Sequence, residues 1–270
     1  MKERLYSKIF HSFSEKRLTT VAGAWVYYFL SSVIPLAFLV ITAFGVFGVS
    51  VTGEIVSRLP EEFRLAGEAI VQTAKTASKG VTIFFVVTVV FSCTTLLNQM
   101  SKDGDFIYGV KSQRKRGVFR RLWAIGALAV LFAVFLCFAF LFSFGSMFFS
   151  RFALKGVWKL LFTIISVSVF IGVSYVIILV LHNFISPVRH KFTGVALGGF
   201  VSLCIIVVGT IGLILYLKFF KPYNAFYGSL TAIIVFLLWA YILMLGLIIG
   251  VIVNKQLYKN NKNNKILKNT

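Results

Sequence analysis

Long apolar runs alternate with short polar segments along the whole chain. The runs cover residues 21–50, 81–97, 122–149, 157–185, 192–217 and 229–253. None of them contains an acidic residue. A helix needs about 20 apolar residues to cross the hydrocarbon of a bilayer, and most of these runs are that long. The pattern therefore predicts six transmembrane helices.

Composition supports the same fold class. Hydrophobic residues make up 59% of the 270 residues and charged residues 13%, with a mean hydropathy of +0.90. Soluble domains are nearer half apolar and one quarter charged, so a soluble fold could not bury this much apolar surface. We predict an all-α integral membrane protein, a bundle of six transmembrane helices. The first run is too long for the core of a signal peptide, so we expect it to remain as a helix.

The charge pattern divides the chain into three parts. We predict a basic cytoplasmic N-terminal segment at residues 1–20, the transmembrane domain at 21–253, and a basic, disordered cytoplasmic tail at 254–270.

The first outer loop, residues 51–79, carries its own helical pattern. Pro60 followed by Glu61 and Glu62 is typical of the first turn of a helix, and Phe63, Ala66, Ile70 and Ala74 then share one face. We predict an amphipathic helix that either caps the bundle or acts as a mobile lid.

Orientation follows from the distribution of Lys and Arg, because cytoplasmic loops carry more of them. With six spans, 19 of the 28 basic residues fall on the side of both termini and nine on the other. Both termini are thus predicted to be cytoplasmic. The surplus of positive charge on the cytoplasmic side then faces anionic lipid head groups, which explains the net charge of +20 without a nucleic-acid partner.

The residues that usually carry chemistry are scattered. Cys93, Cys137 and Cys204 lie in apolar runs without a pairing pattern, and all eight acids lie outside the predicted spans. No paired carboxylates, metal-ligand cluster or activated nucleophile can be recognised. We therefore predict no catalytic residues, no metal, no cofactor and no enzymatic activity. His182 near the end of the fourth run is expected to be a hydrogen-bonding residue rather than a proton carrier.

The first span contains Pro35 near its middle, where proline removes a backbone donor. The break falls at the carbonyl of Ser31, and Tyr28, Ser31 and Ser32 lie within a turn of it and could satisfy the freed group. Either the helix is simply kinked, or these four residues line a polar cavity within the membrane. We take them as candidate substrate-binding residues.

The last two spans carry glycines four residues apart, at Gly194 and Gly198 and at Gly246 and Gly250. Small residues at this spacing let membrane helices approach closely, which predicts a tight hairpin. The joint at 221–229 is aromatic and polar. Its Tyr223, Asn224 and Tyr227 form either an outer gate or an interfacial aromatic belt.

Four stretches of the chain resemble the YihY/virulence factor BrkB family of bacterial inner-membrane proteins. They are residues 22–35, the segment from Leu97 to Arg121, Pro187 to Gly194, and Tyr216 with 223–229. The resemblance implies a six-span helical bundle in the bacterial plasma membrane. The family has also been labelled a ribonuclease, and no residue pattern in this sequence supports that activity. Relatives have an acidic residue where this chain has Ile252, which argues against proton-driven transport.

Two functional hypotheses fit these features. The first is a transporter or flippase for a neutral or amphiphilic substrate, a small solute or a lipid, because the predicted spans contain no acidic residue and their one basic residue, Lys159, lies at the end of a span. The second is a non-transporting envelope partner or lipid-organising membrane protein, with contacts to an envelope protein or to further copies of the chain.

Overall fold

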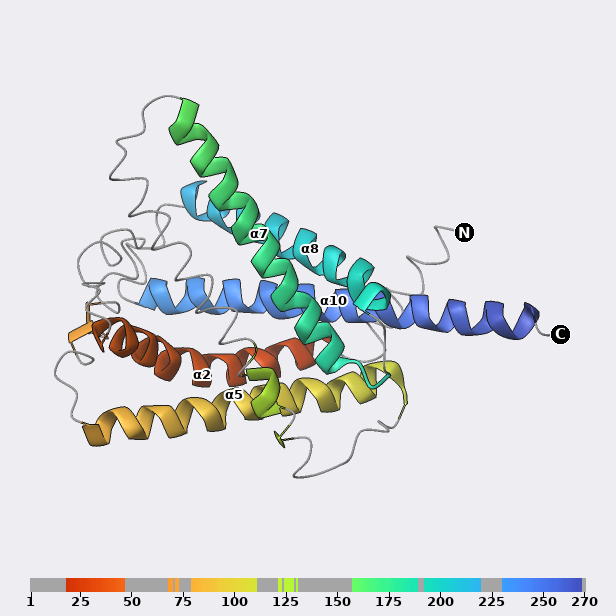
Figure 1. Cartoon of the computed structure of the whole chain (residues 1–270), viewed down its shortest axis with the longest axis horizontal. Coiled ribbons are helices and arrows are strands. Elements are labelled where there is room, and N and C mark those ends of the chain that lie inside the picture. The colour runs from red at the N-terminus through yellow and green to blue at the C-terminus, as the bar shows by residue number, and fades with distance from the viewer. Residues whose placement is uncertain are drawn as a thin grey trace. The chain divides into compact units, whose positions relative to one another are not determined.

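A computed structural model gives the architecture of the chain (Figure 1). It describes residues 18–46, 68–69, 71–72, 79–110, 121–122, 124–128, 130, 157–188, 192–219 and 230–268. Five long helices lie within these residues: α2 (Leu18–Val46), α5 (Lys79–Tyr108), α7 (Val157–Ile185), α8 (Phe192–Phe219) and α10 (Leu230–Lys268).

The prediction of an all-α membrane protein is confirmed. Four helices in the described part of the chain are long and apolar enough to cross a membrane, namely Gly80–Tyr108, Ile164–Ile185, Gly194–Phe219 and Ile233–Asn260. A shorter apolar helix covers Leu18–Val33. The third predicted span, 122–149, lies mostly outside the described residues, so the total of six spans stays a prediction.

The chain divides into two compact units, and the boundaries between them fall within helices. The first unit comprises Met1–Lys16, Ser101–Ile205 and Gly246–Thr270, and the second comprises Arg17–Met100 and Ile206–Leu245. Each unit therefore contains segments that are far apart in the sequence, because helices α5, α8 and α10 each contribute to both.

Aromatic contacts hold the second unit together. Phe38 of α2 stacks on Phe85 of α5 with ring centroids 3.9 Å apart, and Phe29 of α2 lies 6.2 Å from Phe236 of α10. Trp25 is fully buried on the same helix. Such aromatic pairs add about 0.5–1.5 kcal/mol beyond the area they bury. They fix α2 between its two neighbours in this unit.

The first unit brings together the end of α5, the end of α7, the start of α8 and the second half of α10. Gly104 of α5 lies directly against Ile185 of α7, so close that a methyl group at this glycine would meet the Ile185 backbone. Tyr175 of α7 donates a hydrogen bond to the carbonyl oxygen of Ala196 on α8, at 3.0 Å. These helix ends are the ones that the sequence predicts on the cytoplasmic side, and that sidedness stays a prediction.

Two helices continue beyond the ends predicted from hydropathy. The second span was predicted to end at Leu97, but α5 continues to Tyr108. The last span was predicted to end at Val253 with a disordered tail, but α10 continues as a helix to Lys268. In both cases the added turns bury residues in the first unit: Ser101 and Ile107 on α5 and Asn254 on α10. Hydropathy detects where an apolar run stops, whereas backbone hydrogen bonding continues as long as packing supports it.

Local chemistry ends α5 and α7. Gly109 has a φ of +70°, and its N–H donates to the carbonyl oxygen of Asp105, which is the left-handed C-terminal cap that glycine favours. After Ile185 the chain reaches Pro187, which disfavours helical geometry at Ser186. These two ends are therefore set by local sequence.

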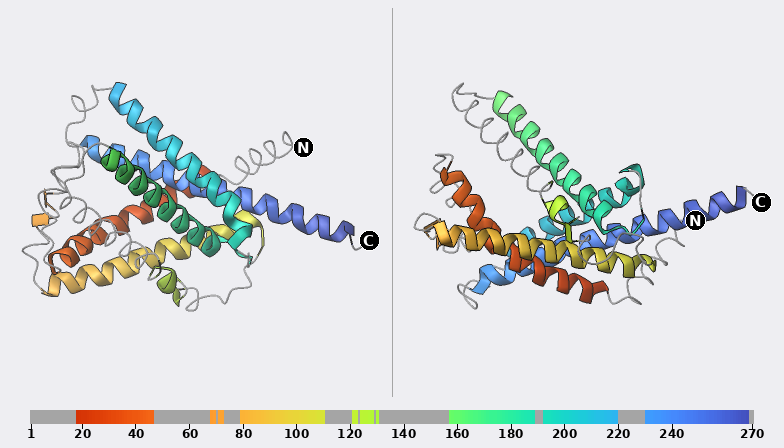
Figure 2. Two further views of the ribbon diagram at one scale, coloured as in Figure 1. Left: turned by 45° about the horizontal axis from the view of Figure 1, so that its top comes forward. Right: turned by 60° about the horizontal axis from the view of Figure 1, so that its bottom comes forward.

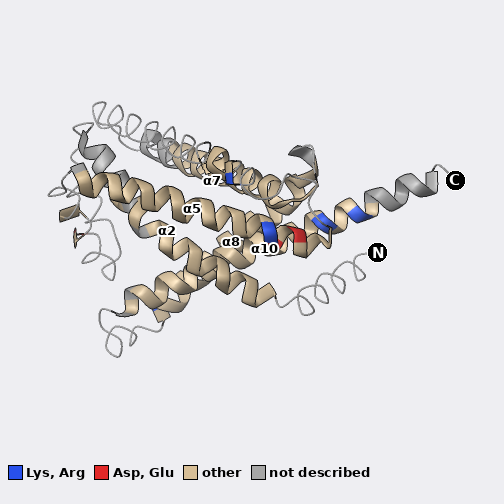
Figure 3. Ribbon diagram, turned by 90° about the horizontal axis from the view of Figure 1, so that it is seen from below, with Lys and Arg blue, Asp and Glu red and all other residues tan. Residues whose placement is uncertain are grey.

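Charged side chains on the described parts of α5 and α10 lie near the C-terminal ends of these helices (Figure 3). Lys102, Asp103 and Asp105 lie on α5, and Lys255 and Lys259 lie on α10. The long apolar stretches before them carry no charge. This is the distribution expected when the ends of these helices reach a polar boundary of the membrane.

Three predicted segments lie wholly or mostly outside the described residues. Most of the amphipathic helix in 51–79 lies outside the described residues, although 68–69 and 71–72 are helical. The joint at 221–229 and residues 1–17 also lie outside them.

The close contact at Gly104 can be tested by adding a single methyl group. We expect Gly104→Ala to lower the free energy of unfolding by about 1–3 kcal/mol, because the Ile185 backbone leaves no room for the new atom. Thermal or denaturant unfolding in detergent measures the change. Gly172→Ala on α7 is the matched control, because nothing lies within 4 Å of a methyl group there. An equal effect of the two substitutions would contradict the role given to this contact.

Candidate functional site

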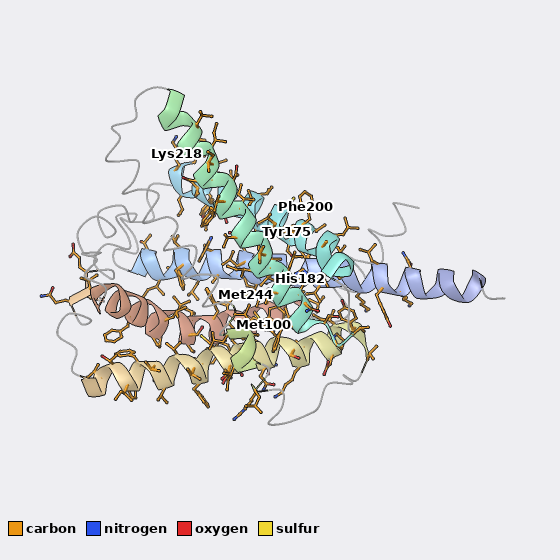
Figure 4. All side chains as sticks on the ribbon, viewed as in Figure 1. Met100, Tyr175, His182, Phe200, Lys218 and Met244 are labelled. Atoms are coloured by element: carbon orange, nitrogen blue, oxygen red, sulfur yellow. The ribbon has the colours of Figure 1, made fainter. Side chains whose placement is uncertain are left out.

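Three uncharged polar side chains meet in the first unit, one each from α7, α8 and α10. His182, Ser202 and Asn254 are 1%, 0% and 1% exposed. We call them the polar cluster. Figure 4 labels His182 on α7, where this helix passes α10. Polar groups buried between membrane helices are costly unless they are paired, so their partners decide what the cluster can do.

Each polar atom of the cluster has a partner. Asn254 Nδ2 lies 3.0 Å from His182 Nδ1, and Ser202 Oγ lies 3.1 Å from His182 Nε2. The Ser202 hydroxyl donates to the carbonyl oxygen of Gly246 at 2.8 Å. Asn254 Oδ1 accepts from the N–H of Gly198 at 2.9 Å, and Asn254 Nδ2 also donates to the carbonyl oxygen of Val195 at 3.3 Å.

The backbone partners determine the direction of every hydrogen bond. The Ser202 hydroxyl donates its only hydrogen to Gly246, so its oxygen must accept a hydrogen bond from the Nε2–H group of His182. Asn254 presents its oxygen to the N–H of Gly198, so its amide nitrogen faces His182 Nδ1 and donates to it. The imidazole is thus neutral, with its proton on Nε2 and a lone pair on Nδ1. This assignment satisfies all donors and acceptors at once.

Glycines make the cluster possible. A methyl group at Gly198 would meet the Gly250 backbone and the Asn254 side chain, and one at Gly250 would meet Ser202, the Gly198 backbone and His182. The crossing of α8 and α10 is visible from two further directions in Figure 2. The predicted close approach of the two glycine-containing spans is thus found at Gly198 and Gly250, and the polar cluster lies directly beside it.

The geometry differs from that of a catalytic Ser-His-Asn arrangement. A nucleophilic serine gives its proton to the imidazole, which in turn donates to the third residue. Here both directions are reversed, because Ser202 donates to a backbone carbonyl and Asn254 donates to the ring. In addition, the described residues contain no group of three or more His, Cys, Asp or Glu side chains that could hold a metal ion. The cluster is therefore organised to join helices and to exchange hydrogen bonds, not to activate a nucleophile.

The four residues predicted to line a cavity in the first span differ in how deeply they are buried. Ser32 and Pro35 are buried on α2, Tyr28 is half-buried and Ser31 is exposed. Ser31 Oγ donates to the carbonyl oxygen of Tyr27 and Ser32 Oγ to that of Phe29, at 3.0 and 2.8 Å. The hydroxyl groups thus bond to carbonyls of the preceding turn instead of the carbonyl of Ser31, which Pro35 leaves without its helical donor. All four residues belong to the second unit.

The predicted gate residues Tyr223, Asn224 and Tyr227 lie outside the described residues. Their role stays a prediction.

Sequence reasoning found His182 as a hydrogen-bonding residue but missed its partners. Ser202 was not singled out, and Asn254 was assigned to a disordered tail. A signal was nevertheless present, because Gly194, Gly198 and Ser202 are spaced by four residues, as are Gly246, Gly250 and Asn254. Each glycine pair is therefore followed, one turn later on the same face, by a polar residue of the cluster.

Comparison with known proteins identifies the relatives of this chain. The profile of the family described as Virulence factor BrkB matches residues 9–269. Proteins named "UPF0761 membrane protein" from the Dugway and CbuG_Q212 strains of Coxiella burnetii are each 31% identical over 84 residues. These alignments cover 30% of this chain, and the chain spans only 30% of the length of these relatives. No solved structure matches the chain.

Removing the Asn254 side chain should weaken the contact among α7, α8 and α10. Hydrogen bonds between membrane helices average about 0.6 kcal/mol, so loss of the three that Asn254 makes predicts that Asn254→Ala lowers the free energy of unfolding by roughly 2 kcal/mol. Unfolding in mixed detergent micelles measures this. Ser174→Ala is the control, because the Ser174 hydroxyl is exposed and bonds only within its own helix, to Phe170. A loss no larger than that of the control would contradict the assigned bonds.

The glycine crossing makes a separate prediction. Gly250→Ala should destabilise the protein by more than 1 kcal/mol, on the order expected for overpacking, because the methyl group meets two helices at once. Gly212→Ala on α8 should be neutral or stabilising, since nothing lies within 4 Å of its added methyl group. Unfolding of both variants under identical conditions makes the comparison. Equal stability of the two would show that α8 and α10 do not approach closely at Gly250.

Proposed function

With this chain established as a member of the virulence factor BrkB family and as a multi-pass bacterial membrane protein, we propose that it moves a neutral or amphiphilic substrate across the membrane. The substrate class is a small uncharged solute or a lipid.

The observation that carries the proposal is the uncharged polar cluster. Polar and ionisable residues within membrane helices are rare, and they commonly mark the path of a substrate or an ion. His182, Ser202 and Asn254 offer hydrogen-bond donors and acceptors without a formal charge. Such groups suit a substrate that has hydroxyl, amide or ester groups. They are poorly suited to a free carboxylate or phosphate, which would need an opposite charge in this environment.

The helix crossing beside the cluster supports a moving part. Transport requires at least two arrangements of the helices around the substrate. Gly198 and Gly250 bring two backbones together without intervening side chains, so small sliding movements meet few steric barriers. The cluster's hydrogen bonds hold one arrangement and could be exchanged for bonds to a substrate.

The remaining sites in the proposal come from the sequence. Tyr28, Ser31, Ser32 and Pro35 are proposed as cavity residues, with Ser32 and Pro35 nearest the interior of the second unit. Tyr223, Asn224 and Tyr227 are proposed as an outer gate. Anionic lipid head groups are proposed as partners of the basic, cytoplasmic ends of the helices.

No enzymatic step forms part of the proposal. The ribonuclease label of the family has no counterpart in the described residues, where the serine, histidine and asparagine are hydrogen-bonded in the wrong direction for nucleophilic catalysis. The printed names of the relatives say only that they are membrane proteins.

A second candidate function is that of a non-transporting envelope partner, as a single chain or as a homo-oligomer. The observation that favours it is the complete pairing of the cluster, whose side chains are at most 1% exposed. A fully paired network can hold helices together without ever opening to a substrate. The two functions differ in whether the cluster must open.

Reconstitution of the purified full-length protein into liposomes tests the proposal. We expect faster movement of fluorescent lipid analogues, or faster release of a trapped uncharged solute, than in protein-free vesicles. Ser202→Ala should slow this movement several-fold, because the variant loses one hydroxyl of the cluster, whereas the control Ser174→Ala should retain the parent rate.

The same assay also defines the result that would contradict transport. If a broad panel of lipids and uncharged solutes shows no flux above protein-free vesicles, with protein that retains its helical circular dichroism, transport is wrong and the envelope-partner function is favoured.

A further inference from the structure

The hydrogen bonds of the polar cluster require a neutral histidine. The lone pair on His182 Nδ1 accepts a hydrogen bond from Asn254, and the Nε2–H group donates one to Ser202. An added proton has one place to bind, at Nδ1. It would then face the amide N–H of Asn254, which is also a donor, at a separation of 3.0 Å.

Asn254 cannot adapt to that proton without losing other bonds. Its side chain could rotate to present Oδ1 to the protonated ring. The amide nitrogen would then face the N–H of Gly198, again donor to donor, and the carbonyl oxygen of Val195 would lose its hydrogen bond from Asn254. The amide group of Asn254 therefore couples the protonation of His182, on α7, to the contact between α8 and α10.

We infer that His182 is a proton-binding site that controls the crossing of α8 and α10. The neutral ring holds the two helices together through Asn254, and the protonated ring separates them. The ligand is the proton itself. This inference does not depend on which substrate is moved, or on whether one is moved.

The surroundings of His182 suit a switch that responds to one proton. Both ring nitrogens bond to uncharged side chains, so no adjacent carboxylate would hold an imidazolium in place. The titratable or charged side chains described on the packed segments are Tyr175 on α7, Cys204 on α8, Lys255, Tyr258 and Lys259 on α10, and Lys102, Asp103, Asp105 and Tyr108 at the end of α5. The ring contacts α8 through Ser202 and α10 through Asn254. A change in the charge of the ring therefore changes the direction of a hydrogen bond to these residues.

The glycines give that change a structural consequence. Because Gly198 and Gly250 bring the backbones into contact, the crossing has no large side chains that could keep it filled when the hydrogen bonds break. A cationic ring next to this contact would favour entry of water between the helices. The crossing thus has a closed, neutral arrangement and an open, protonated one.

Glutamine offers a variant that mimics the neutral ring at every pH. In His182→Gln, the amide oxygen can accept from Asn254 while the amide nitrogen donates to Ser202, as the neutral imidazole does. Gln cannot take up a proton. The variant should therefore remain closed over the whole pH range, and because it preserves the hydrogen bonds it should also fold.

The experiment measures the α8–α10 separation as a function of pH in the full-length protein. Spin labels are placed at Leu197, which is 60% exposed on α8, and at Lys259, which is exposed on α10, after replacement of the three native cysteines. We expect the label separation to increase as pH falls in the parent and to stay constant in His182→Gln. In parallel, nitrogen NMR of a variant that retains only this histidine should show loss of the Nδ1 lone pair over the same pH range.

Each outcome decides the inference. An equal pH response of the parent and His182→Gln overturns it, as does a parent in which the Nδ1 lone pair persists at every pH at which the protein keeps its helical circular dichroism. A response confined to the parent supports it. Asn254→Asp gives an independent check, since a carboxylate accepts from the protonated ring and should move the protonation of His182, followed by nitrogen NMR, to higher pH while removing the clash that opens the crossing. None of these measurements uses flux, so the inference can fail while transport holds, and the reverse.

Discussion

The close approach of α8 and α10 is the constraint on which the rest of the first unit depends. Glycine at 198 and at 250 removes the side chains that would separate the two backbones. Within a membrane there is no hydrophobic force between helices, so their association relies on such close packing and on interhelical hydrogen bonds. Here both occur at one place. The Asn254 side chain reaches the backbone of α8 because the glycines bring that backbone within range, and the bonds in turn hold the glycines in contact.

This arrangement explains how polar residues are accommodated in an otherwise apolar bundle. His182, Ser202 and Asn254 could not be buried singly, because each would leave a donor or acceptor without a partner. Together they form a closed set in which every bond direction is determined by a backbone group at Gly198, Val195 or Gly246. A network of this kind can have only a few stable arrangements. That property makes it useful both for specifying how helices pack and for changing between two states.

Much of the fold can be predicted from local sequence. The apolar runs predict α7 at its observed bounds and α8 within two residues of its end, since Pro187 and the hydropathy limits act locally. The glycine spacing predicts close packing of the last two spans. The ends of α5 and α10 were predicted wrongly for one reason: Ser101, Ile107 and Asn254 lie beyond the apolar runs, and only contacts with distant segments make their burial favourable.

The sequence by itself determined that this is a helical membrane protein with basic helix ends and a glycine-mediated helix contact, because length, hydropathy and residue size act along a single helix. The tertiary structure alone decided that His182, Ser202 and Asn254 form one site. These residues are 20 to 72 positions apart, and their hydrogen bonds depend on how three helices cross. It also decided the protonation state of the ring, since backbone groups of two other helices set the direction of each bond. Periodicity predicts on which face of a helix a residue lies, but not which atoms of another helix that face will contact.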